Sequence, residues 1–435
     1  MNNNLCKRYR DKSSKLTWVI TVALFSSFYI FRTASYGSFV IIALTLLMLF
    51  VLLINKGASV KISFSFFHYY LTLFGLYCIL SSMWAINSKD SLTKGLTIFE
   101  ILLCLSVFYI AHTNGHFDTE LLFKAIMWAG FIVIIYSYYK YGVKTVINTL
   151  STGDRLDSVF NNINEIATLC SLTIILIFYF WLEKGSFFGF IFAVPGFLLL
   201  VASGSKRAIL GLIIGIIVLL ILKLISNESL KSKKKVLFIS LILLVGSIII
   251  SGASFFSSIS NRMNSFIAGL FGDGGSDYST DVRKQLLEFG LEIFKNHPLT
   301  GIGVGCPHIL VNQVFGDDFY LHNNFLELLA GGGVIAFSLF YSIHIVVLFS
   351  IFKNGNINNS INRMIIVILA FLLMSDVSSG TYYSKETYFL LMVCYLHISS
   401  ISQKKMVCSS DSSLITNALI GDISNEKDCV LTSKC

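Results

Sequence analysis

Charged side chains are scarce in this chain. Only 13% of its 435 residues are Asp, Glu, Lys or Arg, while 55% are apolar and the mean hydropathy is +0.75. A soluble domain carries roughly twice that charged fraction, so the composition excludes an ordinary soluble protein and indicates an integral membrane protein. The apolar runs are continuous and about 17 to 25 residues long, which suits membrane-spanning helices rather than the short alternating segments of a β-barrel.

Several signatures of soluble enzymes are missing as well. The sequence has no Walker-type phosphate loop, no paired CxxC and no HExxH, so neither ATP nor zinc is indicated and no cofactor is expected. His297 and His308 are too few to predict a metal site. The formal charge of +9 could suggest a nucleic-acid partner, but the basic residues lie in short loops, a pattern that indicates membrane orientation instead. Only Cys306 of the nine cysteines lies in the long external loop described below, so no disulfide framework is expected there.

The apolar runs predict an all-α integral membrane protein with about twelve spans. The first span, Leu16 to Phe31, follows a basic start and is interpreted as uncleaved. The other spans are expected at 37–54, 66–86, 92–111, 120–139, 164–182, 187–202, 207–225, 236–252, 323–352, 364–377 and 387–400. An even number of spans returns the chain to its starting side, and the basic short loops place both termini in the cytoplasm.

The chain divides into four regions on this interpretation. Spans 1 to 9 occupy residues 1–252, a long external loop occupies 253–321, spans 10 to 12 occupy 322–403, and residues 404–435 form a polar cytoplasmic tail that is expected to be disordered. The long external loop, between spans 9 and 10, exceeds the length of a plain connector and is expected to be functional.

The long loop contains an expected amphipathic helix at 281–294. Its apolar face is formed by Val282, Leu286, Phe289 and Ile293. One of residues 279–281 could cap its N-terminus, and Pro298 would end it. The glycine run Gly301–Gly305 follows; it could bring backbone amides close to a ligand, although a tight turn is the simpler interpretation.

Three candidate residues are expected at the external N-termini of helices. Arg207 opens a span with Ser205 as a possible cap, Arg283 lies in the first turn of the loop helix, and His322 directly precedes the span that begins near Asn323. A helix N-terminus presents free amides and partial positive charge, and a guanidinium suits phosphate oxygens. We therefore expect an anion site at the outer membrane interface.

His322 lies in the stretch 321–335, which joins a polar segment to a strongly apolar one. A neutral imidazole can accept a proton from a hydroxyl, and Asn323 or Asn324 can orient a sugar or cap the helix. Glu327 follows one turn later, where an ionisable group is expensive unless it is paired or functional. These residues predict a proton acceptor with supporting polar groups.

Each candidate also has a simpler structural interpretation. Arg207 could be an interfacial anchor whose charge reaches the lipid headgroups, and Arg283 could be a solvated surface charge. An isolated histidine such as His322 is more often structural than catalytic. Glu327 could be a structural hydrogen-bonding group. Asp376, an ionisable residue late in the eleventh expected span, has the same two interpretations.

These motifs together resemble the O-antigen ligase and polymerase superfamily, the Wzy and WaaL type. The C-terminal resemblance rests on the Arg283 helix, on residues 297–305, and on His322-Asn323-Asn324-Phe325-Leu326-Glu327-Leu328 with the glycines that follow. Ser205-Lys206-Arg207 resembles the Ser-Arg motif of that family, with the lysine as a small departure, and Asn161 to Glu165 resembles the start of its sixth span.

The resemblance implies a GT-C-like, metal-independent inverting glycosyltransferase at the outer, periplasmic face of the bacterial inner membrane. Its donor and acceptor would be oligosaccharides on undecaprenyl diphosphate, held among membrane lipids, with a separate chain-length regulator protein as a possible partner. By this resemblance His322 is the candidate base, Arg207 and Arg283 hold the diphosphate, and Asn323, Asn324 and Glu327 support them.

Within this superfamily, a polymerase that joins repeat units of O-antigen or capsule is favoured. An O-antigen ligase that transfers glycan to the lipid A core, or a protein O-oligosaccharyltransferase, remains an alternative. Outside it, twelve spans with cytoplasmic termini also describe a transporter or flippase, although no repeat between the halves is evident. A structural assembly subunit is a further alternative.

Overall fold

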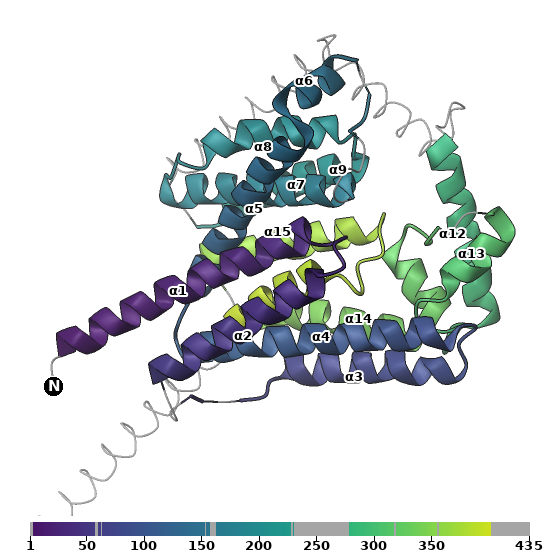
Figure 1. Cartoon of the computed structure of the whole chain (residues 1–435), viewed down its shortest axis with the longest axis horizontal. Helices are drawn as coiled ribbons and strands as arrows, with labels where there is room; N and C mark the ends of the chain where they lie inside the picture. The colour runs from purple at the N-terminus through teal and green to yellow at the C-terminus, as the bar shows by residue number, and fades with distance from the viewer. Residues whose placement is uncertain are drawn as a thin grey trace, which may run out of the picture.

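The computed structural model is a bundle of helices, most of which run side by side (Figure 1). It describes residues 3–56, 60–61, 63–152, 154–156, 162–227, 229, 278–316, 319–354 and 356–401. Within these ranges there is no β-strand, so the all-α prediction is confirmed for the described part of the chain. The predicted span at 236–252 and the tail after residue 403 lie outside the described residues.

The helices match the apolar runs closely. They are α1 (Asn3–Ile30), α2 (Gly37–Lys56), α3 (Phe66–Leu80), η2 (Ser81–Met83), α4 (Ser88–Thr113), α5 (Thr119–Tyr141), α6 (Val143–Thr152), α7 (Ile163–Lys184), α8 (Phe190–Ala202), α9 (Lys206–Ile225), α12 (Tyr278–Asn296), α13 (Pro307–Phe315), α14 (Asn324–Asn354), α15 (Ser360–Asp376) and a last helix over residues 385–401. Seven described helices are long and apolar enough to cross a membrane, with Lys15–Ile30 and Phe190–Ala202 as shorter apolar helices. The chain is therefore a multi-pass membrane protein, while the count of twelve spans stays a prediction.

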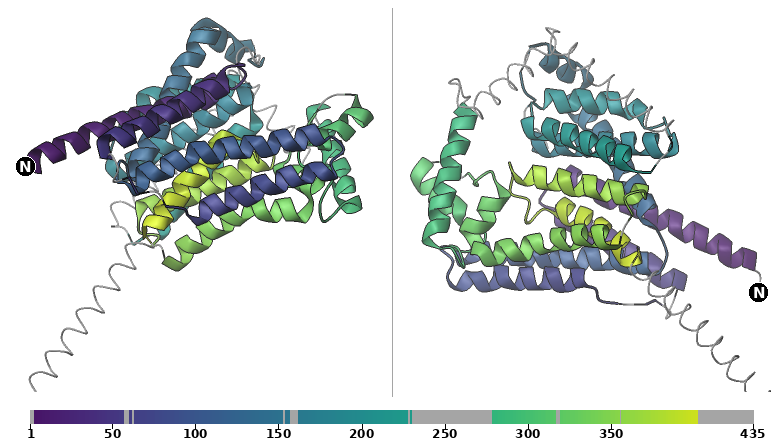
Figure 2. Two further views of the ribbon diagram at one scale, coloured as in Figure 1. Left: turned by 60° about the horizontal axis from the view of Figure 1, so that its bottom comes forward. Right: turned by 180° about the vertical axis from the view of Figure 1, so that it is seen from behind.

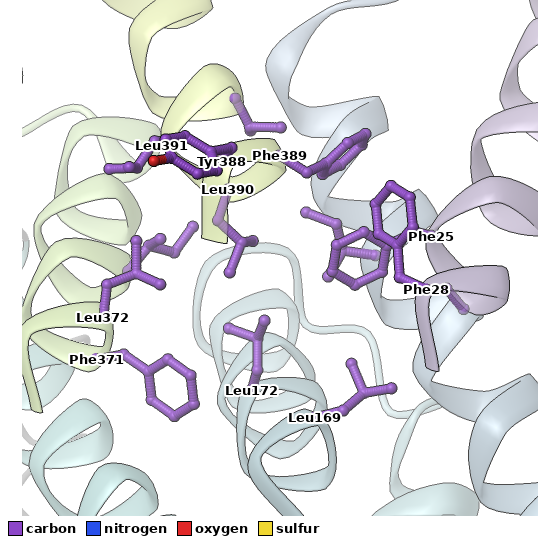
Figure 3. Packing of buried hydrophobic residues seen from close by; sticks show 14 of the residues in the cluster. Phe25, Phe28, Leu169, Leu172, Phe371, Leu372, Tyr388, Phe389, Leu390 and Leu391 are labelled. Atoms are coloured by element: carbon purple, nitrogen blue, oxygen red, sulfur yellow. The ribbon is translucent and has the colours of Figure 1, made fainter. Parts of the chain in front are cut away.

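Neighbouring helices pack in pairs and small groups. α3 packs on α4, α1 on α2 and α5, α7 on α8 and α9, and α9 on α15. Side chains from α1, α7, α15 and the last helix meet in the middle of the bundle, as Figure 3 shows for Phe25, Phe28, Leu169, Leu172, Phe371, Leu372, Phe389 and Leu390. The rings of Phe25 and Phe389 lie 5.0 Å apart, which ties the first helix to the last.

α12 and α13 lie across one end of this bundle (Figures 1 and 2). The amphipathic prediction for α12 is confirmed: Leu286 and Ile293 are buried in a small second core with Leu321, and Val282 and Phe289 pack against it. The predicted start is wrong by one turn. Because α12 begins at Tyr278, residues 279–281 lie inside it rather than at its cap, and Arg283 lies in the second turn rather than the first.

α14 is broken at Gly333, which corrects the prediction of one continuous span. Gly333 has φ 63° and ψ −167°, which only glycine adopts readily. The break frees backbone groups for the preceding loop: the N–H of Ile302 donates to Ala330 O at 3.0 Å, and the N–H of Gly303 donates to Gly331 O at 2.8 Å. The glycine run therefore fastens the loop to α14 and does not present these amides to a ligand.

Candidate functional site

His322 lies in the short segment between α13 and α14, at the end of the bundle that α12 covers. Among the described residues it is the one non-glycine residue with a positive φ, 53°. This left-handed conformation costs roughly 1–2 kcal/mol for a residue with a Cβ. The flanking residues hold it in place, because the N–H of Leu321 donates to Glu327 Oε2 at 3.0 Å and Asn323 Oδ1 accepts from the N–H of Leu326 at 3.0 Å.

The imidazole of His322 is half-buried against aromatic rings. Its centroid lies 4.0 Å from that of Tyr320 and 6.2 Å from that of Phe319. Burial, together with the positive charges of Arg283 and Arg207, lowers the pKa of His322 to about 4. The ring is therefore neutral at pH 7, and both arginines are close enough to act on it. Within the described part of the chain, no hydrogen bond engages either ring nitrogen.

Arg207 is placed by the start of α9. Ser205 caps this helix by accepting from the N–H of Ala208, as predicted. The Arg207 side chain is only 9% exposed, and its Nη2 donates to Glu165 Oε1 at 3.1 Å and to Thr168 Oγ1 at 3.3 Å, both on α7. This arginine is therefore held by a carboxylate, and a free interfacial anchor is excluded.

Glu165 joins Arg207 to a further arginine that the sequence did not reveal. Arg32, just after α1, lies 3.8 Å from Glu165 Oε2 and donates to Glu386 Oε1 at 2.5 Å. Two arginines and two carboxylates from four separated segments thus form one network. A sequence separation of 133 residues between Arg32 and Glu165 leaves no local pattern by which to predict it.

Tyr320 is the second residue that sequence analysis missed. Burial raises the pKa of its phenol, which the charges of Arg207, Glu165, Arg283 and Glu327 also affect. Tyr320 therefore lies among the charged groups of the site. The signal in the sequence was an aromatic residue two positions before the candidate histidine, which is weak on its own.

Asn323 and Asn324 have structural partners. Asn323 caps α14, and its Nδ2 donates to Val377 O at 3.2 Å. Asn324 is fully buried; its Oδ1 accepts from the N–H groups of Thr381 and Tyr382 at 2.7 and 2.9 Å. Both residues fasten the start of α14 to the segment before the last helix.

Glu327 and Asp376 also bind the protein itself. Glu327 is buried and accepts the Leu321 N–H, so its observed partner is the backbone beside His322 rather than an arginine. Asp376 accepts from the hydroxyls of Tyr341, at 2.9 Å, and Thr381. Within the described ranges, no group of three or more His, Cys, Asp or Glu residues could hold a metal ion.

Two of the predicted site residues, Arg207 and Arg283, act electrostatically on the third, His322. A neutral imidazole without a hydrogen-bond partner in the described chain lies within the electrostatic reach of Arg207 and Arg283. Such a group can accept a proton from a hydroxyl while the adjacent guanidinium groups attract an anion. The site therefore has the parts needed to deprotonate a nucleophile beside a phosphate-bearing group.

Comparisons with known proteins agree with the resemblance. No curated protein matches the chain. Residues 188–341, which include Arg207, Arg283 and His322, match the family model described as O-antigen ligase. Members of this family are glycosyltransferase-like enzymes that act on lipid-linked sugars. The match over residues 188–341 supports the resemblance of the chain to the O-antigen polymerase and ligase superfamily.

Proposed function

We propose that this protein is a surface-polysaccharide polymerase that joins undecaprenyl-diphosphate-linked repeat units at the outer face of the bacterial inner membrane. The observation that carries this proposal is the effect of both Arg207 and Arg283 on the ring of His322. A base and a pair of cations at one end of a helical bundle suit a substrate that has a sugar hydroxyl near a lipid diphosphate.

The reaction proceeds as one inverting displacement. His322 takes the proton of an acceptor sugar hydroxyl, and the oxygen attacks the anomeric carbon of the donor on the face opposite the diphosphate. A new glycosidic C–O bond forms as the bond from the anomeric carbon to the diphosphate oxygen breaks, and the electron pair leaves with the lipid diphosphate. Arg207 and Arg283 stabilise this developing charge, which is the task of a metal ion in many soluble transferases.

The proposed topology follows the short-loop charges. Both termini lie in the cytoplasm, and α12, α13 and His322 lie on the periplasmic side. Both lipid substrates reach the site from the membrane, and no nucleotide is needed because the donor is already activated. A separate chain-length regulator is expected from the family resemblance.

Complementation of a deletion strain tests this function. Wild type and His297→Ala, which removes an exposed histidine of the same region, are expected to restore a ladder of long glycans. His322→Ala is expected to abolish the ladder at an equal level of protein in the membrane. Purified protein with lipid-linked repeat units should repeat this difference in vitro.

The glycans that remain separate the alternatives. Single repeat units on the lipid core, without a ladder, show that ligation continues and that polymerisation is lost. Absence of any repeat unit from the core, with polymer still on the lipid carrier, would indicate a ligase. A normal ladder with His322→Ala would refute the proposed chemistry and favour transport.

A further inference from the structure

A small cavity with a mixed polar and apolar lining includes Arg207 in its wall and lies between α1, α7, α9, α15 and residues 379–390. Its volume is about 30 Å³, enough for a water molecule or two. Seven hydroxyl side chains line it: Tyr29, Thr168, Ser375, Ser379, Thr381, Ser384 and Thr387. The carboxylates Glu165 and Glu386 complete the polar wall. The apolar lining includes Leu172, Phe371, Leu372 and Leu390, which Figure 3 shows converging from three helices.

The cavity presents mainly hydrogen-bond acceptors. Ser375 Oγ donates to Phe371 O at 3.0 Å, Ser379 Oγ donates to Ser375 O at 3.2 Å, and Thr168 Oγ1 donates to Asn164 O at 2.8 Å. Because these hydroxyl protons are donated to backbone carbonyls, the lone pairs of the hydroxyl oxygens remain available to accept hydrogen bonds from a ligand. Ionised carboxylates can only accept hydrogen bonds. A ligand with hydrogen-bond donors therefore fits the hydroxyl oxygens of this wall, while the two carboxylates are paired with Arg207 and Arg32.

Two hydroxyls on the wall have no partner in the described chain. Ser384 is 6% exposed and Thr387 is 4% exposed, and no hydrogen bond engages either side-chain oxygen among the described residues. Buried hydroxyls are nearly always paired with protein, water or ligand. Their position on the cavity wall indicates that their partner occupies the cavity.

Arg207 lines this cavity and also acts on the ring of His322. Its Nη2 is held by Glu165 and Thr168 of the cavity wall, while its charge acts on the His322 ring. In a lipid-linked saccharide the first sugar is bonded directly to the diphosphate. A diphosphate near Arg207 would therefore place that sugar within reach of the acceptor-lined wall.

We propose that this cavity binds a hydroxyl-bearing edge of the saccharide next to the diphosphate, such as a diol or a hydroxymethyl group. The proposal rests on the proposed function. The volume admits an edge of the ring and not the whole ring, so the cavity recognises the pattern of hydroxyls on the sugar. The residues that form it, apart from Arg207, lie outside the segment matched by the family model.

Binding measurements on the full-length protein in lipid nanodiscs test the proposal with two probes. One probe is a polyprenyl diphosphate that carries a single saccharide repeat unit, and the other is the same polyprenyl diphosphate without sugar. Ser384→Ala and Thr387→Val remove the hydroxyls that bind nothing else in the described chain, so folding should be retained. Each should weaken binding of the glycosylated probe about 3- to 10-fold, the effect of one hydrogen bond, and leave binding of the bare probe unchanged.

Matched controls remove hydroxyls elsewhere. Ser342→Ala on α14 and Thr97→Val on α4 lie outside the cavity and should change neither affinity. Arg283→Gln should weaken both probes, because it acts on the diphosphate. An equal loss of affinity for both probes in Ser384→Ala and Thr387→Val, or no loss for either, would overturn the sugar subsite and leave a water-filled cavity.

A different pattern of binding would show that the proposed function itself is wrong. If neither probe binds the wild type, or if Arg283→Gln binds both as tightly as the wild type does, the diphosphate site itself is wrong. The sugar subsite, which depends on it, would then be overturned as well. Normal dependence on Arg283 without dependence on Ser384 or Thr387 would overturn the subsite alone.

Discussion

The protonation of His322 depends on burial and on two cationic neighbours. Burial and both arginine charges disfavour a positive charge on the ring, so the pKa of His322 in the free protein is lowered to about 4. A bound diphosphate would neutralise these charges, and the pKa would then rise. The base would thus become stronger when the donor arrives, which suits a reaction that should begin only with the donor in place.

The pH dependence of activity tests this electrostatic coupling. Because the neutral imidazole is the reactive form, kcat/KM should fall as the pH decreases through the low pKa of the free protein. Arg283→Gln removes a charge that lowers the pKa, so the acidic limb should move to higher pH, together with a lower overall rate. In the wild type, kcat reports the substrate complex. Its decrease at acidic pH should therefore occur at a higher pH than the decrease of kcat/KM.

Lys284→Gln provides the control for this shift. Lys284 is exposed on α12 beside Arg283 and is not among the groups that affect the His322 ring. Its removal should leave the acidic limb where it is in the wild type. An unmoved limb in Arg283→Gln would show that Arg283 does not act on the base.

The backbone of His322 gives a prediction that is independent of catalysis. Both His322→Ala and His322→Gly should be inactive, but the glycine variant should be more stable by about 0.5–1 kcal/mol, because alanine keeps the strain of the left-handed conformation. Denaturant unfolding in detergent measures this difference. Equal stability, or a more stable alanine variant, would show that residue 322 leaves the left-handed region when the imidazole is absent.

At the scale of elements, the break in α14 is the feature that positions the loop. A hydropathy profile could not reveal this break, because a broken helix and a continuous helix contain the same run of apolar residues. The glycines at 331–333 were visible, but glycine is tolerated inside spans, so their role depended on the partner segment. By contrast, the amphipathic face of α12 was predictable because apolar residues recur at helical spacing within one short segment of the sequence.

Gly333→Ala should therefore destabilise the protein by more than 3 kcal/mol. A Cβ at Gly333 would lie 2.1 Å from Leu299 O and would also meet the unfavourable backbone angles. Gly185→Ala is the control, since Gly185 has φ 69° but no atom within 4 Å of the added Cβ, and it should cost only about 1 kcal/mol. Thermal inactivation in detergent compares the two. A similar loss for both variants would show that the loop is not fastened to α14 as observed.

At the scale of the whole molecule, the sequence indicated candidate site residues more readily than the residues that hold them in place. Arg207, Arg283 and His322 could be chosen as candidates because each lies in a local sequence motif. Their support was not recognisable: Glu165 bridges to Arg32, and Asn324 binds Thr381 and Tyr382, across separations that only the folded bundle closes. The same limit applied to the hydroxyl-lined cavity, whose residues come from five described helices and from the segment before the last helix.

Substitutions at the two ends of α7 should distinguish an effect on stability from an effect on activity. Glu165 near its start belongs to the site, whereas Glu183 near its end pairs with Lys223 at 3.0 Å and with Arg363 at 2.8 Å, all three nearly buried. Eighteen residues of helix place the two carboxylates about 27 Å apart. Glu183→Gln removes the negative charge that pairs with the buried cations Lys223 and Arg363, which should destabilise the protein by about 3–5 kcal/mol.

Glu165→Gln should also lower stability, and it should in addition reduce the rate per folded molecule, because Arg207 loses the group that orients it. Glu183→Gln should reduce the yield of folded protein but leave that rate unchanged, since its cluster lies at the opposite end of α7. Turnover of lipid-linked repeat units, divided by the folded fraction from size-exclusion chromatography, distinguishes the two effects. A reduced specific rate for Glu183→Gln would show that the ends of α7 are coupled, and an unchanged rate for Glu165→Gln would remove the α7 carboxylate from the site.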